Sequence, residues 1–398
     1  MKTESIQPRP CFLFAVLAVL LFLVPFTQAQ TFTVVYSFTG GSDGGDSTAG
    51  LVNVSGNFFG TTTEGGGYGY GVVFGISPSG HEKVVYSFTG GADGATPASG
   101  LLSFDGYLLG TTSAGGAFGA GTVFAITPQS KEVVLHSFTG GADGSGPQGG
   151  LVMDALGNLY GTTFSGGASG NGTVFELIRP KVKGGAWTEQ VLYSFKTGTD
   201  GANPVSGVTF DKAGHLYGTT SAGGAYSYGT VFQLTHSSSG WTENILYQFQ
   251  LQNDGGTPWA GIVVDASGNL YGATTQGGWG ADGGGTIFKL SSSHSGWSFE
   301  VIDVLSGWGI SGTERNLVLK NGTIFATTHC DGADTAGTVY ELSPSGTSWT
   351  YTELYSFTGG TDGLYSVSTP MFDNQGNLWG TTRYGGANGW GVVFKIKL

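Results

Sequence analysis

The chain has 398 residues, of which 75 are Gly and only 11% are charged, and its net charge is −12. No Lys/Arg cluster offsets this acidity, so the composition excludes nucleic-acid binding through phosphate contacts. The 26 Phe, 17 Tyr and 9 Trp supply a packed core and exclude the disorder that high Gly content alone would suggest.

The first 29 residues have the pattern of a secretory signal peptide. Lys2 and Arg9 provide a positive flank, residues 12–24 form a continuous apolar run, and small residues precede the expected cleavage after Ala29. The apolar run is shorter than the roughly 20 residues of a membrane-spanning helix. We therefore expect cleavage, no membrane span in the mature chain, and a secreted, periplasmic or cell-surface location. An uncleaved anchor is the alternative.

One tandem repeat of 50 to 57 residues fills the rest of the chain. Its first element, Tyr-Ser-Phe-Thr-Gly-Gly from Tyr36, returns from Tyr86, His136, Tyr193, Tyr247 and Tyr355, with a degenerate copy at Asp303. A second element also occurs seven times, at Val73-Phe74, Val123-Phe124, Val174-Phe175, Val231-Phe232, Ile287-Phe288, Val339-Tyr340 and Val393-Phe394. The sequence therefore contains seven structural units.

Each unit contains four short strand segments, as the fourth copy illustrates. Residues 207–211, 215–220, 229–234 and 241–249 are rich in β-branched and aromatic residues, and Gly- and Ser-rich turns separate them. Four strands per unit in seven units predict an all-β fold, a single seven-bladed β-propeller with four-stranded antiparallel blades.

The two ends of the mature chain predict how the ring closes. Residues 31–38 have the pattern of a fourth strand and residues 391–397 that of a third, so the N-terminal strand is expected to complete the last blade. The propeller then spans residues 30–398. Closure removes free sheet edges and stabilises a mature chain in which Cys330 is the single cysteine and no disulfide can form.

The repeated strings resemble those of a known bacterial family. The segments at residues 193–201, 268–275 and 172–175 are similar to the GloVer-type repeats of exported proteins, a tandem-repeat family of Gloeobacter and Verrucomicrobia. The resemblance covers nearly all of the mature chain and implies a propeller-like fold and export, but no particular activity. The sixth unit departs from the family pattern because it lacks the Thr-Gly-Gly-x-Asp-Gly string.

Two Gly-rich loops of each unit are expected on one face of the disc, because strand direction alternates within a blade. These are the loop after the fourth strand and the loop between the second and third strands. Asp recurs in the first of them, at Asp43, Asp93, Asp143, Asp200, Asp254 and Asp362. An Asp before Gly commonly hydrogen-bonds to its own turn. Calcium bound by a ring of acidic loops is the alternative, and no other cofactor is expected.

Positions that vary within these loops are candidates for contacts with a ligand. Aromatic rings on Gly-rich loops can stack on sugars, and the candidate ligand-binding residues are Tyr68, Tyr70, Phe118, Tyr226, Tyr228, Trp279, Arg383, Tyr384 and Trp390. The alternative is that these rings fill the clefts between blades. The expected partners are a polysaccharide or a cell-surface protein.

The sixth unit carries an unusual loop, with His329, Cys330, Asp331 and Asp334 within six residues. His329, Asp331 and Asp334 are candidate metal ligands, although their spacing matches no established zinc motif. Repeat decay is the competing explanation.

An enzyme requires a converging acid, base or nucleophile. Glu64, His329, Asp331 and Arg383 are the catalytic candidates, because the units that carry them are neighbours in a closed ring. The sequence favours an extracytoplasmic binding or scaffold propeller, with glycan binding through the Gly-rich loops. A polysaccharide-active hydrolase or lyase is one alternative, and a purely structural surface protein is another.

Overall fold

The computed structural model describes residues 30–398 except 183, 197, 279–282, 295 and 307–311. The predicted signal peptide lies outside these residues. The described part of the chain consists of strands, turns and loops, and it contains no helix long and apolar enough to cross a membrane.

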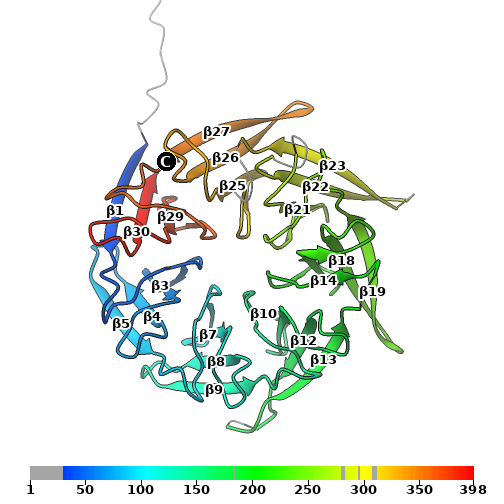
Figure 1. Cartoon of the computed structure of the whole chain (residues 1–398), viewed down its shortest axis with the longest axis horizontal. Coiled ribbons are helices and arrows are strands. Elements are labelled where there is room, and N and C mark those ends of the chain that lie inside the picture. Colours follow the sequence, from blue (N-terminus) through cyan, green and yellow to red (C-terminus); the bar gives the residue numbers. More distant parts are fainter. Residues whose placement is uncertain (1–29, 183, 197, 279–282, 295, 307–311) are drawn as a thin grey trace, which may run out of the picture.

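Seven four-stranded antiparallel sheets form a closed ring, as predicted (Figure 1). Blade one contains β2 (Val52–Val54), β3 (Asn57–Thr62), β4 (Val72–Ile76) and β5 (Glu82–Ser87). Blade two contains β6 (Leu102–Phe104), β7 (Tyr107–Thr112), β8 (Thr122–Ile126) and β9 (Glu132–Ser137). Blade three contains β10 (Val152–Met153), β11 (Leu159–Thr163), β12 (Thr173–Ile178) and β13 (Thr188–Ser194).

The next three blades repeat this order. Blade four contains β15 (Thr209–Phe210), β16 (Leu216–Thr220), β18 (Thr230–Ser237) and β19 (Gly240–Gln248), with the two-residue strands β14 (Gly201–Ala202) and β17 (Ala222–Gly223) paired in its loops. Blade five contains β20 (Val263–Val264), β21 (Leu270–Ala273), β22 (Thr286–Ser293) and β23 (Gly296–Val304). Blade six contains β24 (Val318–Lys320), β25 (Thr323–Thr327), β26 (Thr338–Ser345) and β27 (Ser348–Ser356).

Blade seven closes the ring with strands from both ends of the chain. It contains β28 (Met371–Phe372), β29 (Leu378–Thr381) and β30 (Val392–Lys397), and β1 (Thr31–Ser37) supplies the outer strand. The pairing of β1 with β30 runs from Thr31↔Lys397 to Ser37↔Val392, with a bulge between Val34 and Tyr36. Figure 1 shows this junction where the blue and red strands lie side by side. The predicted closure is confirmed.

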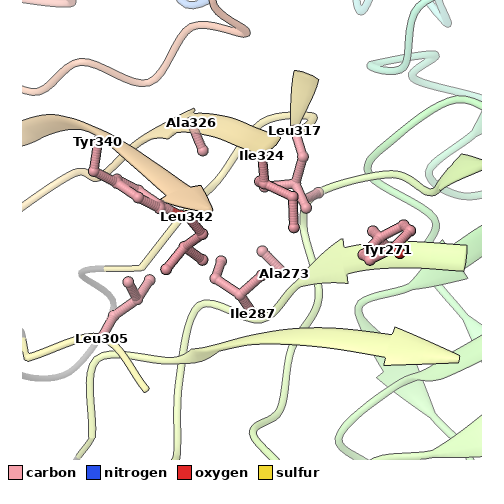
Figure 2. Close-up of a cluster of buried hydrophobic side chains, with 10 residues drawn as sticks. Tyr271, Ala273, Ile287, Leu305, Leu317, Ile324, Ala326, Tyr340 and Leu342 are labelled. Atoms are coloured by element: carbon pink, nitrogen blue, oxygen red, sulfur yellow. The ribbon is translucent and has the colours of Figure 1, made fainter. Parts of the chain in front are cut away.

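The core consists of aromatic contacts repeated at the blade boundaries. At five boundaries the Phe that ends the Tyr-Ser-Phe or His-Ser-Phe string packs edge-on against the Phe of the next blade's third strand, with centroids 5.0 Å apart for Phe38 and Phe74. The corresponding pair of Phe249 and Phe288 is tilted. Between blades five and six the Phe pair is replaced by Leu305 and Tyr340, which join a cluster with Ile287 (Figure 2). The Tyr340 hydroxyl is buried there and hydrogen-bonded to Thr313 (2.8 Å).

The Gly of the Leu-Tyr-Gly-Thr-Thr strand provides room for the ring of the third-strand Phe in the same blade. A Cβ atom on Gly161 would lie 2.7 Å from Cζ of Phe175, closer than real contacts allow. We expect Gly161→Ala to lower the free energy of unfolding by about 1–3 kcal/mol through overpacking, as measured by urea denaturation. Gly67→Ala is the control, because a Cβ there meets only a serine oxygen at 3.8 Å. Equal stability of the two variants would contradict this packing argument.

A second repeated feature, here called the outer slot, lies between the outer strands of adjacent blades. At one register position of the outer strand, blades five, six and seven carry Phe299, Tyr351 and Phe32. Phe299 and Phe32 stack on the Tyr of the preceding blade with 3.7 Å between ring centroids. Blades one to four carry a carboxylic acid at the same register, at Glu82, Glu132, Glu189 and Glu243. Within the described part of the chain, Oε1 of each of these residues is buried without a hydrogen-bond partner.

Candidate functional site

A cavity of about 1190 Å³ lies at the centre of the face that carries the Gly-rich loops, here called the loop face. Its wall contains one residue from each blade at an equivalent position, four residues before the first strand. This wall ring consists of Thr48, Ala98, Gln148, Val205, Trp259, Glu314 and Val367. The seven side chains differ in size, polarity and charge, although the repeats that hold them are alike.

The cavity narrows below the wall ring because the backbones converge two residues further along each blade. A Cβ atom on Gly207 would lie 2.1 Å from the Gly150 carbonyl oxygen. Blade six has Asn316 in place of this Gly. Its side-chain oxygen accepts hydrogen bonds from Oγ of Ser206 (2.9 Å) and the backbone N–H of Gly261 (2.8 Å). At this level of the ring, the Gly residues of blades one to five therefore lie close together with Asn316 of blade six and Thr369 of blade seven.

An ion pair links blade seven to blade one on the cavity wall. Nε and Nη2 of Arg383 donate to the two carboxylate oxygens of Asp46, at 2.7 and 3.2 Å. Burial alone lowers the pKa of Arg383, but the hydrogen bonds and charge of Asp46 outweigh it and raise this pKa. The predicted candidate Arg383 thus lies at the cavity, with its guanidinium held by a carboxylate of the neighbouring blade.

Blade six contributes a second polar group. The buried carboxylate of Glu314 is hydrogen-bonded to Nδ1 of His329, whose ring packs edge-on against Tyr365 with centroids 4.3 Å apart. Burial, with a further contribution from Glu314, raises the pKa of the adjacent Cys330 thiol. A raised pKa keeps a thiol protonated, so Cys330 lacks the thiolate character of a nucleophile.

A second arginine at the cavity, Arg315, belongs to blade six and reaches blade one. Nε of Arg315 donates to the Thr48 carbonyl oxygen (2.9 Å), and the side chain lines the cavity. Among the described residues no carboxylate lies within 4.0 Å of this guanidinium. Arg315 is therefore anchored by a neutral group rather than by an ion pair.

The catalytic candidates are not all brought together. Glu64 and Arg383 line the central cavity, and His329 is hydrogen-bonded to the cavity residue Glu314. Asp331 instead accepts a hydrogen bond from Ser306 (2.7 Å) in a separate cavity of about 370 Å³, which also contains Asp303 and Glu353.

The candidate metal ligands His329, Asp331 and Asp334 do not form a common centre. His329 pairs with Glu314, Asp331 pairs with Ser306, and Asp334 lies in an exposed turn. In the part of the chain that the structure describes, no three His, Cys, Asp or Glu side chains are placed to hold one metal ion. Proximity in the sequence did not predict the directions of these side chains.

The recurring Asp residues hold the loops that follow the outer strands. In blade one's entry loop, Oδ2 of Asp43 accepts from the Tyr36 hydroxyl (2.8 Å) and the Thr39 N–H (2.9 Å). Asp93, Asp200, Asp254 and Asp362 repeat this pattern, and Asp143 faces His136 instead of Tyr. These bonds explain the recurrence of Asp. Calcium binding stays a separate prediction, and a rise in melting temperature on adding calcium would support it.

The aromatic candidates fall into two groups. Tyr68, Phe118 and Tyr226 are 64%, 64% and 52% exposed at the tips of the loops between second and third strands. The rings of Tyr70 and Trp390 lie over Gly90 and Gly40, where they cover the glycines of the neighbouring loop.

The other candidates occupy different positions. Tyr228 packs against a buried cluster, and Tyr384 lies 5.2 Å from the Arg383 guanidinium. Trp279 lies outside the described residues.

Sequence reasoning missed the wall ring and Arg315. Four residues that line the cavity, Gln148, Trp259, Glu314 and Arg315, were not among the candidates. A usable signal was present, since the residue at this position is Thr, Ala, Gln, Val, Trp, Glu and Val in the seven aligned units. The predicted site residues lie instead in the loops that follow the Thr-Thr pairs.

Seven radial four-stranded blades around a lined central cavity define the protein as a seven-bladed β-propeller built from tandem repeats. The Gloeobacter/Verrucomicrobia repeat profile matches residues 22–209, 179–302 and 280–398, and the chain belongs to this family. No curated protein matches the sequence.

Two solved structures are reported as similar to this chain. One is the extracellular domain of a proposed one-component system from B. thetaiotaomicron, with 9% identity and a TM-score of 0.58. The alignment covers 92% of this chain but only 40% of that chain. The other is a proposed oxidoreductase (glucose dehydrogenase) from Thermus thermophilus, with 12% identity, a TM-score of 0.46, and coverage of 92% and 100% of the two chains. At these identities the first similarity concerns the fold alone.

Proposed function

We propose that this protein is an extracytoplasmic binding propeller that holds a polysaccharide on its loop face. The wall ring carries the proposal. A scaffold role alone would place no demand on seven positions that differ around one cavity, whereas a ligand requires several different contacts at once. The exposed rings of Tyr68, Phe118 and Tyr226 extend the apolar surface on which sugars can stack.

A binding assay with matched variants tests this proposal. The wild-type mature chain is screened on a glycan array and by polysaccharide pull-down. Trp259→Ala and the triple variant Tyr68→Ala/Phe118→Ala/Tyr226→Ala are expected to lose affinity about tenfold or more, as for truncated aromatic hot spots. Leu156→Ala is the control, because Leu156 is 78% exposed in the β10–β11 turn on the opposite face. Absence of glycan binding by the wild-type chain would refute the proposal.

An enzymatic alternative rests on the Glu314–His329 pair at the cavity. A His oriented by a carboxylate has the arrangement of a general base. Release of reducing sugar from a polysaccharide that binds, abolished in His329→Ala, would establish a hydrolase or lyase. Binding without release would leave the binding function.

A further inference from the structure

We propose that the central cavity selects an acidic polysaccharide, a chain of uronic acid residues, and that the Arg315 guanidinium binds a uronate carboxylate. This inference rests on the proposed function and specifies its ligand.

Arg315 is fixed in place but keeps donors free. Its Nε–H is used by the Thr48 carbonyl oxygen at 2.9 Å. For its Nη groups, the described part of the chain supplies no hydrogen-bond acceptor and no salt-bridging carboxylate. Arg383 makes a useful comparison, because both of its bonds go to the carboxylate of Asp46. The planar fork of a guanidinium matches a carboxylate, and the fork of Arg315 lines the cavity with no hydrogen-bond acceptor for its Nη groups among the described residues.

The acidic residues around Arg315 are engaged elsewhere. Asp46 is bound by Arg383, and Glu314 is bound by His329. Glu64 is exposed at the edge of the cavity. Burial lowers the pKa of Arg315 while the charge of Glu314 opposes this effect, and an arginine side chain remains protonated in proteins. The charge of Arg383 adds to the effect of burial, and the charge of Asp46 opposes it. A guanidinium that no described carboxylate contacts directly can still pair with an anion from outside.

The size and lining of the cavity favour a sugar over a small inorganic anion. About 1190 Å³ is the volume of a site for several sugar units, and one phosphate would fill little of it. Trp259 and Phe164 offer flat apolar surfaces in the same wall, while Gln148, Asn203 and Ser221 offer hydrogen-bonding groups. Aromatic planes, amides and one unpaired guanidinium together match the C–H face, hydroxyls and carboxylate of a uronate.

The test compares two ligands that differ at the uronate carboxylate alone, which is ionised in one and methyl-esterified in the other. Oligogalacturonate and its fully methyl-esterified form are titrated into the wild-type mature chain by calorimetry. We expect the acid to bind at least tenfold more tightly, with an affinity that falls as salt rises. Arg315→Gln is expected to remove this preference, and Arg315→Lys to restore part of it. Lys131→Gln removes an exposed cation on the opposite face and is expected to change nothing.

The outcomes separate the inference from the proposed function. Equal or tighter binding of the ester by the wild-type chain overturns the inference and leaves polysaccharide binding intact. Binding of neither form, together with an empty glycan array, overturns both. If Arg315→Gln melts at a lower temperature, the comparison of acid and ester in the wild-type chain still decides the inference, because it requires no variant.

Discussion

We expect the protein to melt at a higher temperature at pH 5 than at pH 8.5. The cause is the outer slot of blades one to four, where Glu82, Glu132, Glu189 and Glu243 are half-buried and Oε1 of each is shielded from water. Burial, followed by the charge of the Asp in the preceding loop, raises the pKa of the first three to about 7 and of Glu243 to about 8. In the fourth slot, Asp200 also hydrogen-bonds to Glu243, and Lys196 partly opposes the shift.

The direction of the effect follows from proton linkage. The folded-state pKa of each Glu exceeds its ordinary value of 4.5, so protonation favours the folded chain. This stabilisation is complete below pH 4.5, decreases as the pH rises, and is lost once the pH passes about 7 to 8. Four slots of the same kind act in the same direction.

Other titratable groups reduce the stability of the folded chain at low pH. Burial lowers the pKa of His136, although the charge of Asp143 partly opposes this shift, so His136 opposes the Glu effect below pH 6.5. Hydrogen bonds outweigh burial and lower the pKa of Asp211, Asp265, Asp362 and Asp373. The stability that these carboxylates contribute is present above pH 3.8 and is lost as the pH falls further. Maximum stability is therefore expected near pH 5.

One substitution tests this assignment directly, because another blade already carries the replacement residue at the same register. Glu132→Phe would place on Tyr86 the ring that blade five places on Tyr247 through Phe299. We expect this change to raise the melting temperature at pH 8.5 more than at pH 5, and so to reduce the pH dependence. Glu64→Gln, at an exposed carboxylate, is the control. A melting temperature that rises from pH 5 to pH 8.5 would contradict the assignment.

The second large effect is expected from Phe38→Ala, at the junction that closes the ring. Phe38 is fully buried, follows β1 directly and packs against Phe74 and Tyr36. Truncating a buried Phe costs about 3–5 kcal/mol of unfolding free energy. Because β1 is joined to its blade only through β30, we also expect this variant to expose residues 30–38 to proteases.

A matched variant separates lost packing from an open ring. Phe195 occupies the same position between blades three and four and is equally buried. Phe195→Ala should lose comparable stability in urea denaturation without a new cleavage site near the N-terminal strand. The same proteolytic pattern in both variants would show that the closing strand is held no differently from the other outer strands.

The repeats allowed the architecture to be predicted because each blade obeys the same local rules. In blade four, the predicted strands at 207–211 and 215–220 correspond to β15 and β16, with shifts of one or two residues at their ends. Repetition was less informative about the site. The wall ring is defined by departures from the repeat, and the bond from Arg315 to Thr48 joins residues 267 positions apart. Closeness in the sequence was also a poor guide, since His329 pairs with Glu314 of the central cavity while Asp331 lines the smaller, separate cavity.

The pairing of β1 with β30 has a consequence for synthesis of the protein. The first strand of the propeller to be translated has its partner in the propeller's last strand, so it stays unpaired while all the intervening blades are made. A strand in this state presents open hydrogen-bonding groups to other chains. Completion of the ring is thus a late event of high contact order, and a nascent chain kept extended by a chaperone is protected during that interval.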